Sequence, residues 1–537
     1  MSAGPFLCQV VRKFARPLQW CKAGFAAMMF IKVSSAALIG IDAREVEIEV
    51  NEGGNSPKIV IVGLPDAAVR ESRDRFVTAV LNSGFVSPKG HTTINLAPAD
   101  LKKEGPSFDL PIALAAIGLR SEFAQNPNDF LIAGELSLDG KVRPIKGALC
   151  MALEARRLGK RGVIVPASNV HEAARVTGVE AHGVATLREA HDLLMEDPLR
   201  APLDPAMFAN EPVAEYPVDF AEVKGQVHVK RALEVAVAGG HNLLMLGPPG
   251  TGKSMLAKRI PTIIPMMSED EAIEVTKIHS ICGMLDDENG FLTTRPFRSP
   301  HHTISDAGLL GGSSNPNPGE ISLAHHGVLF LDELPEFRRS TLEVMRQPLE
   351  DGKVTISRAS GSMTFPAQFM LVAAMNPCPC GYYGDLKREC RCGPVQVQRY
   401  RQRISGPLLD RIDLHVEVPL IDYKELAASE AGETSAVIRE RVATAREVQR
   451  DRFADSQGVV CNSAMQPRQL KQWCQLDKEG GQYLDHAMNE MDLSARAYDR
   501  ILKVARTLAD LDAEASIAAN HVLEAIQYRS LDRDLWS

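Results

Sequence analysis

The sequence lacks an apolar run long enough to cross a bilayer, and we therefore expect no membrane-spanning helix, which needs about 20 consecutive apolar residues. It also lacks an excess of positive charge, because 60 Lys and Arg residues against 68 Asp and Glu residues give a formal net charge of -8. The net charge thus does not indicate nucleic-acid binding. It does not exclude it either, since a ring-shaped protein can confine its basic residues to a small pore.

Cysteine is sparse for a protein built on disulfides. There are ten cysteines in 537 residues, and four of them fall between residues 378 and 392. This grouping indicates a reducing compartment and a metal site rather than a disulfide scaffold. We therefore expect a cytoplasmic protein.

Acidic residues are absent before Asp42, whereas the leader formed by residues 1–31 carries four Lys or Arg residues. One interpretation is a targeting peptide. No small-residue cleavage site follows a continuous apolar core, so export is not inferred. The other interpretation is an upstream extension of a chain whose translation begins at Met28 or Met29.

The remaining composition, 45% hydrophobic and 24% charged, is that of an ordinary globular protein, and the length predicts about three domains. Strand-like patterns cover 46–50, 58–62 and 91–96, and helical patterns cover 66–83 and 110–119. The mixture of strands and helices predicts an α+β fold for this first part of the chain.

Two motifs of this part resemble the peptidase domain of the Lon protease family, which has a ribosomal S5 domain 2-like fold. They are Lys102–Ser107 and Gly134–Ile145. The resemblance implies that Ser107 occupies the position of the nucleophile, while Leu149 occupies that of its lysine base. A serine without an adjacent base is a weak nucleophile. With Lys146 three residues out of place, we expect the fold without the peptidase activity.

A glycine-rich loop follows an apolar run at Asn242–Leu246 and precedes a helical pattern that begins at Met255. A strand, a loop and a helix in this order predict a phosphate-binding loop whose backbone N–H groups face the phosphates. Lys253 would reach the β- and γ-phosphates of ATP, and the Ser254 hydroxyl would bind Mg²⁺. The loop residues predicted to bind ATP are Gly247, Pro248, Pro249, Gly250, Thr251, Gly252, Lys253 and Ser254.

A second apolar run, Gly327–Leu331, ends in Asp332 and Glu333, as a Walker B strand does. Asp332 would hold Mg²⁺ and Glu333 would polarise the attacking water. The two Walker elements resemble those of the AAA+ family. That resemblance implies that Asn376, which ends the next apolar run, is sensor 1, and that residues 219–226 flank the adenine.

Leu408–Asp413 resembles the arginine-finger motif of the helicase and chelatase branch of AAA+ proteins, with Arg411 as the finger. Such an arginine reaches a neighbouring subunit's nucleotide, which implies a homo-hexamer. The alternative is an ion pair with an adjacent aspartate. The same resemblance assigns Arg496 as sensor 2 at the start of a long helix, with Arg500 as the competing candidate.

The cysteine group consists of two C-x-C pairs, and four thiolates suit a tetrahedral Zn²⁺ ion. Nine residues that include two glycines separate the pairs, which allows the loop to fold back on itself. Free or redox-active thiols are the alternative, because C-x-C is tighter than the usual zinc spacing. The predicted ligands are Cys378, Cys380, Cys390 and Cys392.

The segment Asp351–Phe365 has the pattern of a β-hairpin and precedes the sensor 1 strand. In related helicases a hairpin at this place contacts DNA in the central pore. We therefore name Lys353 and Arg358, together with the basic run 399–403, as candidates for phosphate contact. The alternative is an exposed hairpin with solvated charges.

Two further segments, 297–305 and 318–326, resemble the magnesium-chelatase-like AAA+ proteins. From about residue 32 to 531 the chain resembles the ComM/YifB family among them. Each segment contains a histidine pair, at 301–302 and at 325–326. We expect these pairs to have a structural or nucleotide-coupled role, because Mg²⁺ prefers oxygen ligands.

The resemblance implies a multidomain α/β and α+β protein that hydrolyses ATP and acts as a ring motor on single-stranded or branched DNA, as a branch migration helicase. A metal-insertion ATPase and an ATP-dependent peptidase are the alternatives. The expected units are a leader (1–31), a Lon-like domain (32–194), a proline-rich linker (195–217), an AAA+ core (218–424) and a C-terminal helical lid (425–537).

Overall fold

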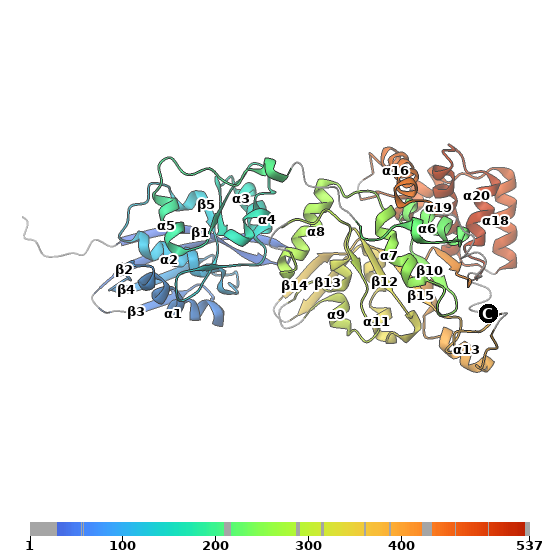
Figure 1. The fold of residues 1–537 in the computed structure, drawn as a ribbon, viewed down its shortest axis with the longest axis horizontal. Helices are drawn as coiled ribbons and strands as arrows, with labels where there is room; N and C mark the ends of the chain where they lie inside the picture. Colours follow the sequence, from blue (N-terminus) through green and yellow to red (C-terminus); the bar gives the residue numbers. More distant parts are fainter. Residues whose placement is uncertain are drawn as a thin grey trace, which may run out of the picture.

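The computed structural model describes residues 29–531, except for 55, 57, 209–215, 286–289, 313–315, 359–360, 386–387, 421–431, 457 and 492. The molecule is elongated, with the N-terminal part at one end, a parallel sheet in the middle and a group of helices at the other end (Figure 1). Most of the expected leader, the middle of the expected linker and the expected boundary at 424/425 lie outside the described residues.

The N-terminal part begins with a four-stranded sheet in the order β1-β2-β4-β3, in which only β3 and β4 are parallel. Side chains alternate between the core and the outside along β2, and this alternation is the period expected of a sheet with one covered face. Its elements are β1 (Met29–Ile39), β2 (Asp42–Gly53), β3 (Lys58–Val62), α1 (Ala67–Asn82), β4 (His91–Ala97) and α2 (Asp109–Gly118).

A second, parallel sheet in the order β5-β8-β9 completes the N-terminal part. Short apolar strands separated by helices produce it, because a parallel connection needs a crossover. Its elements, with a small β6–β7 pair, are β5 (Phe130–Ile132), β6 (Glu135–Leu136), β7 (Val142–Arg143), α3 (Ala148–Leu158), β8 (Gly162–Pro166), α4 (Val170–Ala173), β9 (Glu180–Val184) and α5 (Leu187–Met195).

The central sheet is parallel throughout and has the strand order β11-β12-β15-β10-β16. Its inner strands are continuous apolar runs because helices or other elements cover both faces. The strands are β10 (Leu243–Leu246), β11 (Phe297–Arg298), β12 (Val328–Leu331), β15 (Met370–Met375) and β16 (Leu414–Glu417). The predicted strands at 242–246, 327–331 and 369–375 are confirmed.

Alternate residues of these strands face two different cores. Met245, Phe330 and Val372 pack with the C-terminal helices, whereas Leu244 and Leu329 pack with the hairpin β13–β14. The surrounding elements are α6 (Val227–Gly239), α7 (Lys253–Ile263), α8 (Glu269–Cys282), α9 (Asp306–Leu310), α10 (Glu320–Leu323), α11 (Arg339–Glu343), α12 (Arg346–Asp351), β13 (Lys353–Arg358), β14 (Gly361–Pro366), α13 (Pro394–Arg401) and α14 (Gly406–Leu409).

The described residues from 432 to 531 contain α-helices and no named β-strand, as the sequence predicts. An apolar stripe runs along α19, whose residues Ile501, Val504 and Leu508 pack against the central sheet's core. The helices are α16 (Ser435–Arg452), α17 (Pro467–Trp473), α18 (Lys478–Glu490), α19 (Ala495–Leu511) and α20 (Ala519–Gln527). Within the described residues, no helix is both long and apolar enough to cross a membrane.

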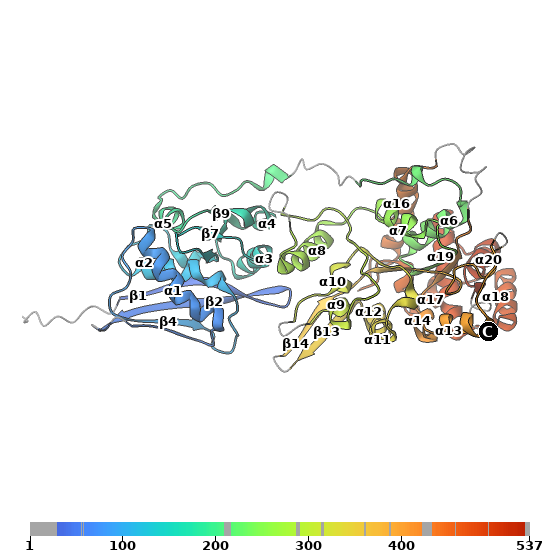
Figure 2. The same ribbon diagram turned by 60° about the horizontal axis from the view of Figure 1, so that its bottom comes forward.

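The N-terminal part contacts the central part through α8, which lies beside α3 in both views (Figure 2). Ile281 of α8 belongs to the apolar core around α3, and Lys277 pairs with Asp42 at 2.6 Å. The Ser280 hydroxyl donates to Glu172 at 2.7 Å and accepts from the Gly147 N–H at 3.0 Å, all three groups being buried. Sequence patterns did not predict this contact.

Candidate active site

The predicted phosphate-binding loop joins the end of β10 to the first turn of α7. Gly250 and Gly252 have φ angles of +85° and +86°, which favour glycine. Gly247 has no room for a side chain, since a Cβ there would collide with the carbonyl of Val418. These constraints explain why the loop needs glycine at these three positions.

Lys253 lies inside the curve of this loop and is buried. Its Nζ donates to the carbonyl oxygens of Gly247 at 2.7 Å and Pro248 at 2.9 Å, and to Asn376 Oδ1 at 3.2 Å. Desolvation lowers the pKa of Lys253, although the carboxylates of Asp332 and Glu333 oppose this shift. The structure therefore brings together the predicted P-loop lysine and the predicted sensor 1 residue.

The end of β12 supplies the two carboxylates. Asp332 Oδ2 accepts a hydrogen bond from Ser254 Oγ at 2.6 Å, and its other oxygen accepts the N–H of Glu333 at 3.0 Å. Glu333 has a left-handed backbone with φ of +52°, a conformation that non-glycine residues seldom adopt. Its Oε2 lies 3.5 Å from His302 Nδ1.

The order of the strands explains why these groups meet. β12, β15 and β10 are neighbours and parallel, with Leu331 opposite Ala373 and Leu246 opposite Met375. Their carboxyl ends therefore lie at one edge of the sheet, which is where α/β sheets bind ligands. We call this the carboxyl edge.

Arg411 lies at the other edge, which we call the amino edge. It precedes β16, as Asn242 precedes β10, and the Asn242 side chain donates to the Arg411 carbonyl at 2.9 Å. The four residues of β10, at roughly 3.3 Å each, separate the two edges by about 13 Å. The side chain of Arg411 is buried and pairs with Glu350.

The start of α19 also lies at the amino edge. Arg496 is exposed and comes within 3.9 Å of Asp410, while Arg500 is half-buried and pairs with Asp413. Burial, with repulsion from Arg529, lowers the pKa of Arg500 to about 10. The structure thus places Arg496 and Arg500 together with Arg411, on the side of the sheet opposite the chain's own P-loop.

One residue beside the loop was missed by sequence reasoning. Gln226 is buried, has a φ of +52°, and donates to the carbonyls of Thr251 at 3.0 Å and Pro419 at 3.3 Å. Its Oε1 is buried, and within the described part of the chain it has no hydrogen-bond partner. Gln226 is the last residue of the segment that was expected to flank the adenine. This position in the sequence is the signal that could have identified it.

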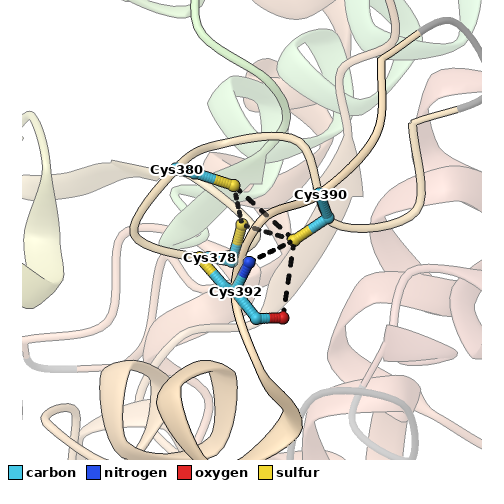
Figure 3. A group of neighbouring side chains, drawn as sticks. All are labelled: Cys378, Cys380, Cys390 and Cys392. Atoms are coloured by element: carbon cyan, nitrogen blue, oxygen red, sulfur yellow. Dashed lines mark hydrogen bonds between the residues drawn. The ribbon is translucent and has the colours of Figure 1, made fainter.

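The four cysteine side chains gather in one loop between β15 and α13 (Figure 3). Their sulfur atoms all lie within 4.8 Å of one another. The Cys378–Cys380, Cys380–Cys390 and Cys378–Cys390 distances are 3.3, 3.5 and 3.7 Å, close to the edge of about 3.8 Å of a tetrahedron with Zn–S bonds of about 2.3 Å. They are too long for disulfide bonds. Backbone N–H groups of Tyr382 and Arg391 lower the pKa of Cys380 to about 6, which favours a thiolate.

The histidine pair at 325–326 forms a hydrogen-bonded cluster with α8. Gln368 N–H donates to His325 Nδ1 at 3.0 Å, so the neutral ring carries its proton on Nε2, which lies 2.9 Å from Glu274. His326 contacts the same carboxylate at 3.0 Å. A metal ion at His325 Nε2 would need that proton on Nδ1, so this geometry favours the structural role over a metal site.

The predicted hairpin is confirmed as β13 and β14, which pair from Lys353–Pro366 to Arg358–Gly361. Lys353 is exposed, and the side chain of Arg358 lies outside the described residues. In the basic run, Arg399 and Arg403 are exposed beside a cavity of about 510 Å³ that Arg339 also lines. Arg401 instead donates to Pro377 O at 3.3 Å and stacks on Tyr383.

Comparisons with known proteins give consistent results along the chain. Residues 219–426 match the family model described as magnesium chelatase, subunit ChlI, residues 46–169 match subunit ChlI of Mg-chelatase, and residues 432–529 match the ChlI C-terminal model. Competence protein ComM of Haemophilus influenzae is 43% identical over 513 residues, which cover 93% of this chain and 97% of the relative. The chain belongs to the ComM/YifB family of magnesium-chelatase-like AAA+ proteins.

Two other relatives mark the breadth of this family. Protein YifB of Escherichia coli is 42% identical over 503 residues, covering 93% of this chain and 97% of YifB. The magnesium-chelatase 38 kDa subunit of Rhodobacter capsulatus is 26% identical over 218 residues, covering 37% of this chain and 55% of that subunit. Similarity over nearly the full length is thus to the ComM/YifB proteins, while the magnesium chelatase subunit matches a part.

Membership of the ComM/YifB family supports an ATPase that uses ATP and Mg²⁺. The residues at the carboxyl edge fit a bound Mg²⁺ ion, which takes oxygen ligands. The Ser254 hydroxyl and the Asp332 carboxylate supply two such oxygen atoms and lie 2.6 Å apart. AAA+ proteins commonly assemble as rings.

Proposed function

We propose that this protein is a ring-forming ATPase, a homo-hexamer, that moves along DNA and drives branch migration of recombination intermediates, including those of natural transformation. The ATP-hydrolysing part of the proposal is supported by the meeting of Lys253, Asp332, Glu333 and Asn376 at one sheet edge. Glu333 would polarise the attacking water, Asn376 would help to orient that water near the γ-phosphate, and Mg²⁺ would supply charge neutralisation when bound.

The position of Arg411 carries the proposal of a ring. Because Arg411 lies at the amino edge, it cannot reach the nucleotide at its own carboxyl edge, and a neighbouring subunit's nucleotide is its suitable partner. Arg496 starts α19 at the same edge, so we extend the proposal to it as a second residue that serves the neighbour's nucleotide.

Mixed rings test this arrangement. Arg411→Ala and Glu333→Gln should each nearly abolish ATP turnover, and mixing the two variants should restore part of it. The recovered activity arises at interfaces where one subunit supplies Glu333 and its neighbour supplies Arg411. If mixtures stay inactive although both variants assemble, the site is not shared between subunits.

The hairpin supports the DNA part of the proposal, because Lys353 is exposed at its base and DNA affinity depends on such phosphate contacts. Single-stranded or forked DNA should stimulate ATP turnover by the full-length protein. Lys353→Ala should weaken DNA binding and lower the slope of log affinity against log salt by about 0.7 for a single-strand contact. Lys478→Ala, an exposed lysine on α18, is the matched control.

The two other candidate functions predict different results. A metal-insertion ATPase related to magnesium chelatase should show turnover that neither single-stranded nor forked DNA changes, with no branched substrate processed. A peptidase should cleave casein, and Ser107→Ala should stop the cleavage. The peptidase is disfavoured because Leu149 is fully buried and Lys146 packs against Gly283, which follows α8.

The remaining units complete the proposal. We assign residues 32–194 to a Lon-like domain without peptidase chemistry and residues 425–537 to a lid that responds to the nucleotide. We also propose that Cys378, Cys380, Cys390 and Cys392 hold a structural Zn²⁺ ion, supported by the closeness of their sulfur atoms, which all lie within 4.8 Å of one another. Arg401, which bonds to the start of this loop, would link the bound ion to α13.

A further inference from the structure

We propose that Glu350 is a positioning residue that restrains Arg411 and connects it to the β13–β14 hairpin, so that a DNA strand held by the hairpin releases the arginine toward the neighbouring subunit's nucleotide. This inference rests on the proposed function, since it concerns how DNA stimulates ATP turnover. It adds a residue that neither the Walker motifs nor the arginine motif includes.

The two side chains of the Glu350–Arg411 pair differ in their exposure to solvent. Arg411 is 6% exposed and Glu350 is 54% exposed, so a buried guanidinium is held by a carboxylate on the surface. Arg411 Nη2 donates to Glu350 Oε1, and Nη1 donates to the Pro407 carbonyl. The arginine is therefore bound within its own subunit in this arrangement.

The hydrogen bonding of Arg411 is incomplete. Its Nε is buried and has no hydrogen-bond partner among the residues that the structure describes. A guanidinium has five N–H donors in a planar fork that matches phosphate oxygens. Arg411 now uses one oxygen atom each of Glu350 and Pro407, whereas a terminal phosphate group would offer three oxygen atoms to the same fork, which makes the pair with Glu350 replaceable.

Space for this exchange exists next to the pair. Glu350 and Arg411 line a cavity of about 380 Å³, and Val354 and Thr355 of the hairpin line it as well. Arg411 and the hairpin thus share one cavity wall, although 56 positions of sequence separate Thr355 from Arg411.

The chain connects Glu350 rigidly to the hairpin. Only Asp351 and Gly352 separate it from β13, and Gly352 N–H donates to Pro348 O at 2.9 Å in the last turn of α12. The Gly352 carbonyl accepts the N–H of Ala367, just after β14, at 2.8 Å. Both strands of the hairpin are therefore tied to the helix end that carries Glu350.

The core beneath the hairpin strengthens this connection. Val354 and Phe365, opposite each other on the two strands, pack with Met345 and Leu349 of the chain leading into and through α12. A displacement of the hairpin by bound DNA must therefore move the end of α12. Glu350 would move with it while Arg411, fixed by its backbone to Asn242, would stay.

The test is Glu350→Gln in the full-length protein, with ATP turnover measured with and without single-stranded DNA. Loss of the restraint should raise ATP turnover without DNA by about two- to fivefold, which is the range expected for an ion pair with one exposed partner. The ratio of turnover with DNA to turnover without DNA should fall toward one. Glu343→Gln is the matched control, because Glu343 lines the same cavity but pairs with Arg346 at 3.0 Å. It should change neither quantity.

The outcomes separate this inference from the proposed function. Unchanged turnover and stimulation in Glu350→Gln, or a fall in basal turnover, would overturn the restraint while leaving the ATPase intact. Arg411→Ala measured in parallel should be inactive. Normal turnover by Arg411→Ala would instead remove the proposed role of Arg411, and a wild-type protein that DNA does not stimulate would remove the DNA role.

Discussion

Ser254 and Asp332 are joined by a hydrogen bond of 2.6 Å between residues 78 positions apart in the chain. The hydroxyl comes from the first turn of α7 and the carboxylate from the end of β12. Because β15 lies between β12 and β10 in the sheet, the bond spans the carboxyl edge above Asn376. It holds side by side the two oxygen atoms that we propose as ligands for Mg²⁺.

Glu333→Gln should bind ATP and assemble but lower the turnover number by about 10²–10⁴-fold, as expected on losing a group that activates water. The amide keeps the size of the side chain and cannot accept a proton. Nucleotide binding measured with a fluorescent ATP analogue should be unchanged. Glu336→Gln, an exposed acid three residues on that pairs with Arg403, should keep normal turnover, and normal turnover in Glu333→Gln would exclude its catalytic role.

Cys378→Ser should remove the bound zinc and lower the melting temperature. The other three sulfur atoms cannot complete a tetrahedral site, and each kcal/mol lost from a 150–250-residue domain lowers the melting temperature by about 2–4 °C. Elemental analysis of protein purified without chelators should give about one zinc per chain in the wild type. Cys282→Ser, on α8 outside the cluster, should retain the metal; a wild-type protein without zinc contradicts the assignment.

Lys503→Met should change how stability depends on pH. Burial, with repulsion from Arg500, lowers the pKa of Lys503 from 10.5 to about 8. Below about pH 8 Lys503 is charged in both the folded and the unfolded chain, so burial of the charge lowers the stability of the folded state by its full amount. As the pH rises from about 8 to 10.5, the folded chain releases the Lys503 proton first and the unfolded chain releases it later, so this loss of stability disappears.

The wild type should therefore gain stability relative to Lys503→Met between pH 8 and 10.5, as measured by the midpoints of urea unfolding. Lys471→Met, an exposed lysine on α17, controls for the loss of a surface charge. If the stability of the wild type and that of Lys503→Met change equally with pH, the charge of Lys503 is not buried.

Ser280→Ala should loosen the contact between the N-terminal part and α8. The change leaves the buried Gly147 N–H and Glu172 carboxylate without their shared partner, at a cost of about 1–3 kcal/mol. Hydrogen exchange at α3 and α8 should become faster in the full-length protein. Lys277→Ala removes an exposed ion pair at the same contact and should cost under about 1 kcal/mol; equal effects would mean that the buried network does not hold the contact.

Much of the ATPase part could be predicted from the sequence because its signals are local. A short apolar run before a glycine-rich loop, and another that ends in Asp332 and Glu333, each determine a strand and the chemistry at its tip. The parallel sheet and the β13–β14 hairpin follow from these patterns. The short strands of the second N-terminal sheet and the docking role of α8 carry no comparable periodicity, so they were not predicted.

The sequence by itself determined which residues we predict to bear the chemistry: the P-loop, the two carboxylates, Asn376 and the four cysteines all lie in recognisable strings. Only the tertiary structure decided where Arg411 and Arg496 lie, since the edge of a sheet that a residue occupies depends on strand order and direction, which no local pattern encodes. The tertiary structure also decided the contact of Glu350 with Arg411. Elements far apart in the chain must pack together before the Arg411 guanidinium can be buried against this carboxylate.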